Sequence, residues 1–167
     1  MSEAHEKAKK HKPRKSLRLA DYDYGSSGAY SFTACTKGRK PYFKHPILEL
    51  ILKEEWANLP HHFNGITPDT FIIMPDHVHG IVWIDAEVEG PPTLSDVIGG
   101  YKSIINVVWL QYIKENGIRG PWQLWQRSFN DHIVRNERDL VEKQNYILNN
   151  PIVAELKEEQ KKSEEGM

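Results

Sequence analysis

The sequence predicts an α+β fold in which an antiparallel sheet is backed by two helices. Apolar runs of strand length and longer segments with helical periodicity both occur, and turn-forming residues separate them. Their order is strand, helix, strand, strand, helix, strand and then an additional helix. This order is typical of the ferredoxin-like, or split βαβ, arrangement.

The first half of the chain supplies three strands and one helix. Residues 29–36 alternate well enough for a first strand, and residues 46–59 form an amphipathic pattern with proline in its first turn and another proline closing it. Residues 66–74 and 79–85 are the next two strands. Pro75 and Asp76 between them indicate a tight turn.

The second half supplies two more helices and a short strand. From residue 93 to 116, apolar side chains recur at 3.6-residue spacing, which predicts a long helix that packs on the sheet. Residues 122–127 and 131–135 are expected to be short extended pieces. A final helix should span residues 136–150, and Pro151 should then break or kink the chain.

Length and composition indicate one globular domain outside the membrane. The chain has 167 residues, of which 39% are hydrophobic and 27% charged, and it contains no apolar run of membrane-spanning length. The first 18 residues lack the apolar stretch of a secretory signal, so a cytoplasmic protein is expected. Cys35 is the only cysteine, which excludes an internal disulfide and leaves nitrogen and oxygen ligands for any metal.

The two ends of the chain carry opposite charge although the net charge is only −1. Residues 1–18 form a basic arm that is expected to be disordered, and residues 155–167 form an acidic, charged tail that is either helical or frayed. A basic arm can reach DNA phosphates, but solvated termini of this composition are also common. Both interpretations of the arm stay open.

A His-x-His pair falls at the start of a predicted strand and is the main clue to function. Alternate side chains of a strand share a face, so His77 and His79 point the same way with Cα atoms about 6.6 Å apart, and Val78 faces the other side. Two imidazoles placed in this way can bind one divalent ion. The alternative is a pair of hydrogen-bonded histidines with no ligand.

The tyrosines differ in their position on the predicted helices. Tyr101 and Tyr112 lie in an apolar stripe, which favours structural roles, whereas Tyr146 lies about 160° from the apolar side of its helix at 100° per residue. Asn150 follows one turn later on the same face as Tyr146. That helix can therefore present a nucleophile and an oxygen ligand together, although Asn150 could equally be a C-terminal cap before Pro151.

Three blocks together resemble the single-tyrosine HUH transposases, specifically the REP-associated tyrosine transposase group. They are Met74-Pro-Asp-His-Val-His-Gly80, Trp125-Gln-Arg-Ser-Phe-Asn-Asp-His-Ile-Val-Arg135 and Tyr146-Ile-Leu-Asn-Asn-Pro151. The opening Ser16-Leu-Arg-Leu-Ala-Asp-Tyr-Asp-Tyr-Gly25 and Gly28-Ala-Tyr-Ser-Phe-Thr33 resemble the start of that group. The resemblance implies a ferredoxin-like or RRM-like catalytic domain over residues 19–154.

The resemblance also implies a role for each site residue. His77 and His79 would be metal ligands, Tyr146 the nucleophile and Asn150 the third ligand, where some relatives have Gln. The ion would be Mg²⁺ or Mn²⁺, acting as a Lewis acid on the scissile phosphate. The implied product is a 5′-phosphotyrosyl enzyme with a free 3′-hydroxyl. The sequence does not identify the group that accepts the tyrosine proton.

The implied substrate is single-stranded DNA next to imperfect hairpins. Candidate DNA contacts are Arg14, Lys15, Arg18, Lys102, Arg119, Arg127, His132, Arg135 and Arg138. Trp122, Trp125 and Phe129 are interleaved with the arginines of the third block, a mixture suited to base stacking. Alternatively, Trp125 and Phe129 belong to the core and the arginines form a solvated edge.

The main functional prediction is a metal-dependent endonuclease and strand transferase for single-stranded DNA with REP-like hairpins. One alternative is a catalytically silent, RRM-like module that binds DNA or RNA. Another is a zinc hydrolase that uses His77 and His79 with His132. Related mobile-element enzymes form homodimers, but the REP-associated group tends to carry its tyrosine helix in the same chain, so a monomer is favoured.

Overall fold

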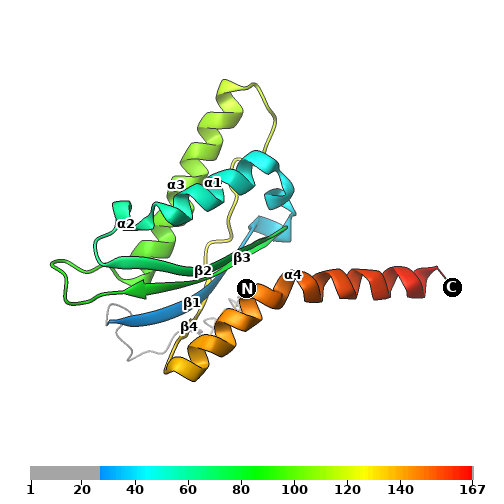
Figure 1. Cartoon of the computed structure of the whole chain (residues 1–167). Coiled ribbons are helices and arrows are strands. Elements are labelled where there is room, and N and C mark those ends of the chain that lie inside the picture. The colour runs from blue at the N-terminus through cyan, green and yellow to red at the C-terminus, as the bar shows by residue number, and fades with distance from the viewer. Residues whose placement is uncertain (1–26, 167) are drawn as a thin grey trace, which may run out of the picture.

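A computed structural model describes residues 27–166 as three layers (Figure 1). A four-stranded sheet contains β1 (Gly28–Cys35), β2 (Ile66–Met74), β3 (His77–Ile84) and β4 (Asn130–Ile133). Helices α1 (Pro46–Ala57) and α3 (Leu94–Glu115) cover one face of this sheet, and α4 (Glu137–Glu165) lies on the other. Three short helices, η1 (Lys37–Arg39), η2 (Tyr42–Lys44) and α2 (Leu59–His62), complete the described part.

The sheet has the order β2-β3-β1-β4, and every neighbouring pair is antiparallel. This arrangement confirms the predicted α+β, ferredoxin-like fold. In the register of β1 and β3, Thr33 lies opposite His79 and Cys35 lies opposite His77. Because directly opposed residues point to the same face, β1 provides the side chains that neighbour the His pair.

Residues 122–127 form the predicted extended piece only around Trp125, where Lys37 N donates to Leu124 O at 2.8 Å and Gln126 N to Cys35 O at 2.9 Å. The segment makes one isolated bridge, between Thr36 and Trp125, and the side chains of Leu124 and Trp125 are buried in the core. Both apolar side chains are therefore used for packing at the end of β1 instead of alternating along a strand. The next predicted piece is confirmed as β4.

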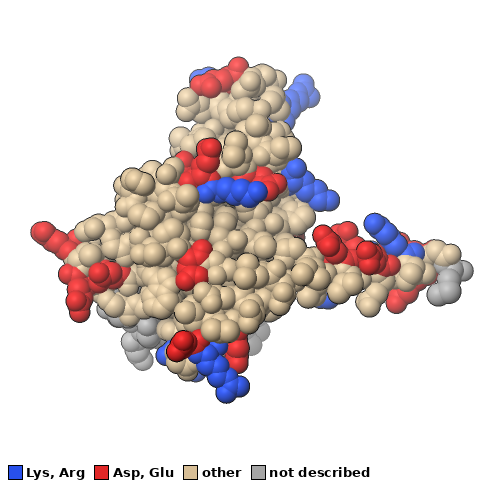
Figure 2. Space-filling model, viewed as in Figure 1, with Lys and Arg blue, Asp and Glu red and all other residues tan. Residues whose placement is uncertain are grey.

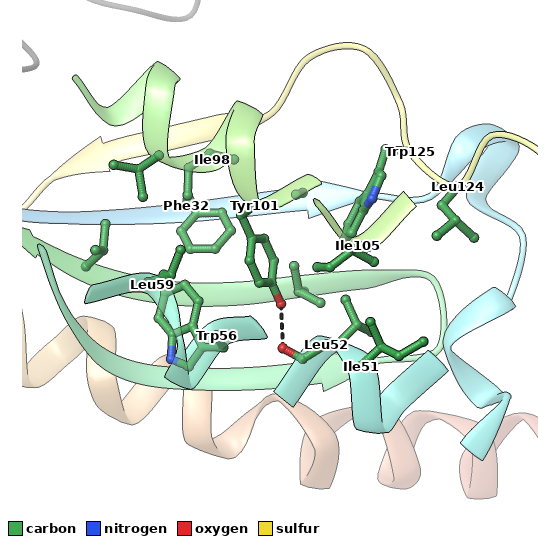
Figure 3. Packing of buried hydrophobic residues seen from close by; sticks show 14 of the residues in the cluster. Phe32, Ile51, Leu52, Trp56, Leu59, Ile98, Tyr101, Ile105, Leu124 and Trp125 are labelled. Carbon is green, nitrogen blue, oxygen red and sulfur yellow. Dashed lines mark hydrogen bonds between the residues drawn. The ribbon is translucent and has the colours of Figure 1, made fainter. Parts of the chain in front are cut away.

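The main core fills the space between the sheet and the pair α1 and α3 (Figure 3). The Trp56 ring stacks on Phe71 with centroids 4.5 Å apart, and the Tyr101 hydroxyl donates to the Leu52 carbonyl at 2.9 Å. Each large apolar side chain buried here contributes about 1.5–3 kcal/mol relative to exposure. The structural role predicted for Tyr101 is confirmed.

A smaller apolar cluster lies on the opposite face, beneath α4. Ala29, Ile81 and Ile147 are its fully buried members, and Ile72 and Leu140 pack against it. Ile147 contributes from α4 and is only 2% exposed. Because Ile147 directly follows Tyr146, this cluster fixes the position of the helix turn that carries Tyr146.

Helix α4 is longer than predicted, because it continues through Pro151 to Glu165. The expected end at Asn150 is therefore wrong, and Asn150 is not a helix cap. The alternative expectation of a kink is confirmed, since α4 bends between its orange and red parts in Figure 1. Proline has no N–H to donate to the carbonyl four residues earlier, which bends a helix without having to end it.

The part of α4 beyond the bend projects from the body (Figure 1). Its side chains are mostly charged and of both signs, as Figure 2 shows, and Lys161 pairs with Glu165 at 3.8 Å. The tail prediction is thus met in its helical form as far as residue 165. None of the helices within residues 27–166 is long and apolar enough to cross a membrane.

Candidate active site

The two histidines of β3 point at one another. The Nε2 atoms of His77 and His79 are 3.1 Å apart, and the ring centroids are 4.6 Å apart. Val78, between them in sequence, is fully buried in the main core. The alternation expected for a strand therefore places both imidazoles on the α4 face of the sheet.

The other nitrogen of each ring has its own partner. His77 Nδ1 lies 2.6 Å from Asp76 Oδ1, and His79 Nδ1 lies 2.7 Å from Thr33 Oγ1. A carboxylate only accepts, so His77 carries a proton on Nδ1, and in the neutral form of the ring the lone pair is on Nε2. A hydroxyl can donate or accept, and Thr33 therefore suits either tautomer of His79. Such outer contacts are the ones that orient histidines toward a metal.

His79 is held in its neutral form. Burial, assisted by the charges of His77 and Arg39, lowers the pKa of His79 to about 4. Near neutral pH the ring is uncharged, as a metal ligand must be. In the absence of an ion, the Nε2–H of His79 can donate to Nε2 of His77. With an ion bound at Nε2, the proton of His79 would be on Nδ1, facing Thr33.

The donor atoms fit a divalent ion. Two ligands about 2.1 Å from one ion, at the right angle of octahedral coordination, are about 3.0 Å apart. The observed Nε2 separation of 3.1 Å matches this value. Asn150 lines the same cavity as His77, which has a volume of about 370 Å³, so the predicted third ligand lies on the His77 side of the pair.

No group of three or more His, Cys, Asp or Glu side chains suited to a metal occurs within residues 27–166. His132 is instead paired with Asp139, its Nε2 lying 3.1 Å from Oδ2. The alternative of a zinc hydrolase with three histidine ligands therefore has no support from this arrangement.

Tyr146 approaches the His pair of its own chain. Its ring centroid is 6.0 Å from that of His79, the planes meet at 76°, and the residue is 65% exposed. The two side chains line a small cavity of about 150 Å³ together with His132 and Lys143. The helical projection correctly placed Tyr146 outside the main core. The Tyr146 phenol, the His79 and His132 imidazoles and the Lys143 ammonium group thus border one accessible cavity.

A hydrogen-bond tether holds α4 beside this cavity. Gln144 Nε2 donates to Asp69 Oδ1 at 2.9 Å, and Trp83 Nε1 donates to Asp69 Oδ2 at 3.0 Å. Asp69 lies in an irregularity of β2, where the register with β3 shifts between Pro68 and Phe71. Burial acts to raise the pKa of Asp69, but hydrogen bonds from Trp83, Gln144 and Thr70 outweigh it and lower this pKa.

At position 80, directly after the His pair, the core leaves no space for a side chain, and the residue is glycine. A Cβ atom there would lie 2.7 Å from Phe32 Cε1 and 3.0 Å from Trp56 Cη2. The glycine lets the core rings close against β3 directly behind the histidines. It is therefore explained by packing.

Lys102 does not behave as a predicted DNA contact. It is only 9% exposed, and its Nζ donates to the carbonyls of Gln126 and Arg127 at 2.6 and 3.3 Å. Burial lowers the pKa of Lys102. The ammonium group instead connects α3 to the segment before β4. The predicted DNA contact is corrected because these two carbonyls, 24 and 25 residues away in sequence, already accept hydrogen bonds from Lys102.

The other predicted DNA contacts lie in several places. His132 borders the Tyr146 cavity, and the exposed Arg135 and Arg138 lie at and just beyond the start of α4, where Arg138 pairs with Glu142. Arg127 is exposed beside the Lys102 segment. Arg119 is exposed in the loop after α3 and lines a hollow beside the last turns of that helix. Arg14, Lys15 and Arg18 belong to the basic arm, which lies outside the described residues.

The three aromatic residues expected near the arginines separate into two kinds. Trp125 is buried and packs on Phe43 with ring centroids 5.0 Å apart, so the core alternative is correct for it. Phe129 packs against the same core. Trp122 is 79% exposed, and beside Arg119 it lines a hollow of about 800 Å³. Only Trp122 offers an open ring face.

Five residues of the site were not predicted from the sequence: Thr33, Asp69, Asp76, Lys143 and Gln144. Lys143 could have been found, because it lies three residues before Tyr146 on the predicted helix. No local pattern indicates Thr33 or Asp69, whose partners are 46 and 75 residues away in sequence.

The fold and the site define an α+β protein in which a strand-borne His pair faces a tyrosine-bearing helix. No family model matches the chain. An uncharacterized protein of Haemophilus influenzae is 31% identical over 164 aligned residues, covering 85% of this chain and 90% of that protein. The chain belongs to the same family as this protein.

Solved structures show where the fold occurs. A REP-associated tyrosine transposase bound to a REP hairpin is similar with a TM-score of 0.59 and 20% identity, over 82% of this chain and 73% of that one. A proposed transposase of Deinococcus radiodurans R1 has a TM-score of 0.50 and 19% identity, over 79% and 95% of the two chains. The resemblance to REP-associated tyrosine transposases is thus confirmed at the level of the fold.

Proposed function

We propose that this protein is a metal-dependent endonuclease and strand transferase that acts on single-stranded DNA beside hairpins. The observation that carries the proposal is the position of Tyr146, whose ring lies 6.0 Å from His79 of a converging His pair. The DNA hairpin in the structure of the REP-associated relative supports this class of substrate. The transposase fold supports the reaction type.

The reaction assigned to Tyr146 is an in-line displacement at phosphorus. The bond from phenol oxygen to phosphorus forms as the bond to the 3′-oxygen breaks, which leaves a 5′-phosphotyrosine and a free 3′-hydroxyl. Overall, the phenol proton is transferred to the departing 3′-oxygen. Because the phosphate link is preserved, a 3′-hydroxyl can later attack it and rejoin the strand.

Each side chain has a defined part in this scheme. Mg²⁺ or Mn²⁺, when held by His77, His79 and Asn150, would polarise the scissile phosphate. Asp76 and Thr33 keep the two rings oriented, at 2.6 and 2.7 Å from their Nδ1 atoms. Lys143 contributes a positive charge to the cavity of Tyr146, where a phosphate carries negative charge.

All of these groups come from one chain, and we therefore propose that a monomer is sufficient for cleavage. The alternative of a silent RRM-like binding module is less favoured. Such modules bind nucleotides on an open sheet face, whereas α4 covers one face of this sheet and α1 and α3 cover the other (Figure 1).

A denaturing gel tests the proposed function. Full-length protein is mixed with Mn²⁺ and an end-labelled single strand that carries a REP-like hairpin, and label that stays with the protein after denaturation reports the covalent adduct. Tyr146→Phe should form no adduct, and His77→Ala should lose it by weakening the metal site. A persistent adduct in Tyr146→Phe, or none in the wild type, would overturn the assignment.

A further inference from the structure

The His pair separates two hollows. On one side, Tyr146 and His79 line the smaller cavity of about 150 Å³. On the other, His77 and Asn150 line the larger one of about 370 Å³, and Tyr146 is not among its lining residues. The nucleophile therefore approaches from one side only, which leaves the larger cavity without a role in the attack.

The larger cavity is bordered by basic side chains. Arg39, Lys44 and Lys157 line it, and its acidic residues are Asp76 and Glu158. The Asp76 carboxylate is already engaged, with Oδ2 3.0 Å from Arg39 Nε and Oδ1 2.6 Å from His77 Nδ1. Because Arg39 and Asp76 pair with each other, Lys44 and Lys157 remain against Glu158, and the three cations and two carboxylates of the lining give a formal net charge of +1.

Two separate elements supply these cations. Arg39 and Lys44 belong to the η1–η2 loop, which also exposes Lys37 and Lys40, and Lys157 lies on the projecting part of α4. In Figure 2, basic side chains lie at the edge of the body near the root of that projection. The basic η1–η2 loop was not among the DNA contacts expected from the sequence.

The direction in which the 3′-oxygen leaves phosphorus indicates what the larger cavity binds. In phosphoryl transfer the attacking and leaving oxygens lie roughly in line with phosphorus. Since the Tyr146 oxygen comes from the His79 side, the 3′-oxygen departs toward His77 and Asn150. The strand that ends in this 3′-oxygen must then run into the larger cavity.

We propose that the cavity lined by Arg39, Lys44 and Lys157 binds backbone phosphates of the DNA strand that leaves with the 3′-hydroxyl. The binding of phosphates stands on the charges of the cavity alone, and the side of the strand rests on the proposed function. From Asn150 to Lys157, α4 extends about 10 Å at 1.5 Å per residue. That length corresponds to about three nucleotides of a strand that keeps the 3.4 Å rise of duplex DNA. By holding this strand after cleavage, the enzyme keeps the 3′-hydroxyl available for rejoining.

The first measurement is the salt dependence of binding to a fluorescent single-stranded oligonucleotide that carries a REP-like hairpin. Lys44→Gln and Lys157→Gln should each reduce the slope of log K against log salt by about 0.7, the value for one contact to a single strand. Lys53→Gln is the matched control, because Lys53 lies on α1 and pairs with Glu49. Unchanged slopes in both test variants, or an equal change in the control, would overturn phosphate binding.

The second measurement tests the side of the strand. After adduct formation, the release of the labelled 3′-hydroxyl fragment is followed at 0.1 M salt. Lys44→Gln and Lys157→Gln should each release this fragment about fivefold faster. One phosphate contact changes the affinity for a single strand about fivefold when the salt concentration changes tenfold, from 1 M to 0.1 M. Unchanged release in both variants despite reduced slopes would place the phosphates on the other strand. If no adduct forms at all, the proposed function fails while the first measurement still decides phosphate binding.

Discussion

Replacing Thr33 with valine should weaken metal binding although Thr33 is not itself a proposed ligand. Thr33 Oγ1 is the partner of His79 Nδ1 at 2.7 Å. Valine has nearly the same shape and no hydroxyl, so this substitution removes the hydrogen bond with little change in packing. His79 then loses the group that stabilises the tautomer with its lone pair on Nε2.

The size of the effect follows from this contact. Removing an outer hydrogen bond to a metal-binding histidine typically reduces metal affinity 10- to 100-fold. At about 1.4 kcal/mol per tenfold change, this corresponds to about 1.4 to 2.7 kcal/mol. Stability in the absence of metal should fall by a smaller amount, about 1 kcal/mol for one hydrogen bond.

The assay is titration of the chelator-treated protein with Mn²⁺, followed by the electron paramagnetic resonance signal of free Mn²⁺. Thr33→Ser is the matched control, since serine keeps a hydroxyl at the same place, and it should retain an affinity close to that of the wild type. Urea unfolding without metal measures any general loss of stability separately.

Equal Mn²⁺ affinity in the wild type and Thr33→Val would refute the reasoning. It would mean that His79 does not bind the ion through Nε2 or that its tautomer is set by another contact. Equal losses in the valine and serine variants would also count against a hydroxyl-specific effect.

Three other predictions concern stability. Hydrogen bonds keep the folded pKa of Asp69 below its ordinary value, so its carboxylate stabilises the fold above about pH 4. This contribution is lost as the pH falls through the folded pKa, and urea unfolding of Asp69→Asn should therefore change less between pH 7 and pH 3 than that of the wild type. Gly80→Ala forces a Cβ to within 2.7 Å of Phe32 and should cost about 1–3 kcal/mol in thermal unfolding; unchanged stability would contradict the packing account. Tyr101→Phe removes the bond to the Leu52 carbonyl and should cost about 1 kcal/mol in urea unfolding, while adduct formation by the folded protein stays intact.

The parts of the site that the sequence predicted depend on local periodicity. The strand repeat placed His77 and His79 on one face, and the helical repeat placed Tyr146 outside the core with Asn150 one turn away. Both repeats are properties of a few consecutive residues. They hold once the segment adopts its secondary structure, whatever packs around it.

Thr33, Asp69 and the role of Lys102 were missed because they depend on contacts between distant segments. Thr33 reaches His79 only because β1 and β3 pair in one register, and Asp69 reaches Gln144 only at an irregularity of β2. Lys102 was assigned to DNA because no local pattern indicates the carbonyls of Gln126 and Arg127 that accept from it. Each correction thus concerns a tertiary contact.

The extent of α4 was misjudged for a different reason. The helix was expected to end at Asn150 with a break or kink at Pro151, but a helix can continue beyond a bend when its remaining residues favour helix. The Lys- and Glu-rich sequence after Pro151 is of that kind, and Lys161 and Glu165 pair one turn apart. Local propensity therefore outweighed the loss of one backbone hydrogen bond.

Helix α4 carries both Tyr146 and Asn150, and a small apolar cluster and the Gln144–Asp69 hydrogen bond hold it on the sheet. Ala29 and Ile81 form the floor on which Ile147 rests. A displacement of α4 would move Tyr146 and Asn150 away from His77 and His79 together. The candidate site therefore depends on the position of α4, and a substitution that displaces this helix should separate Tyr146 and Asn150 from the His pair without changing either imidazole.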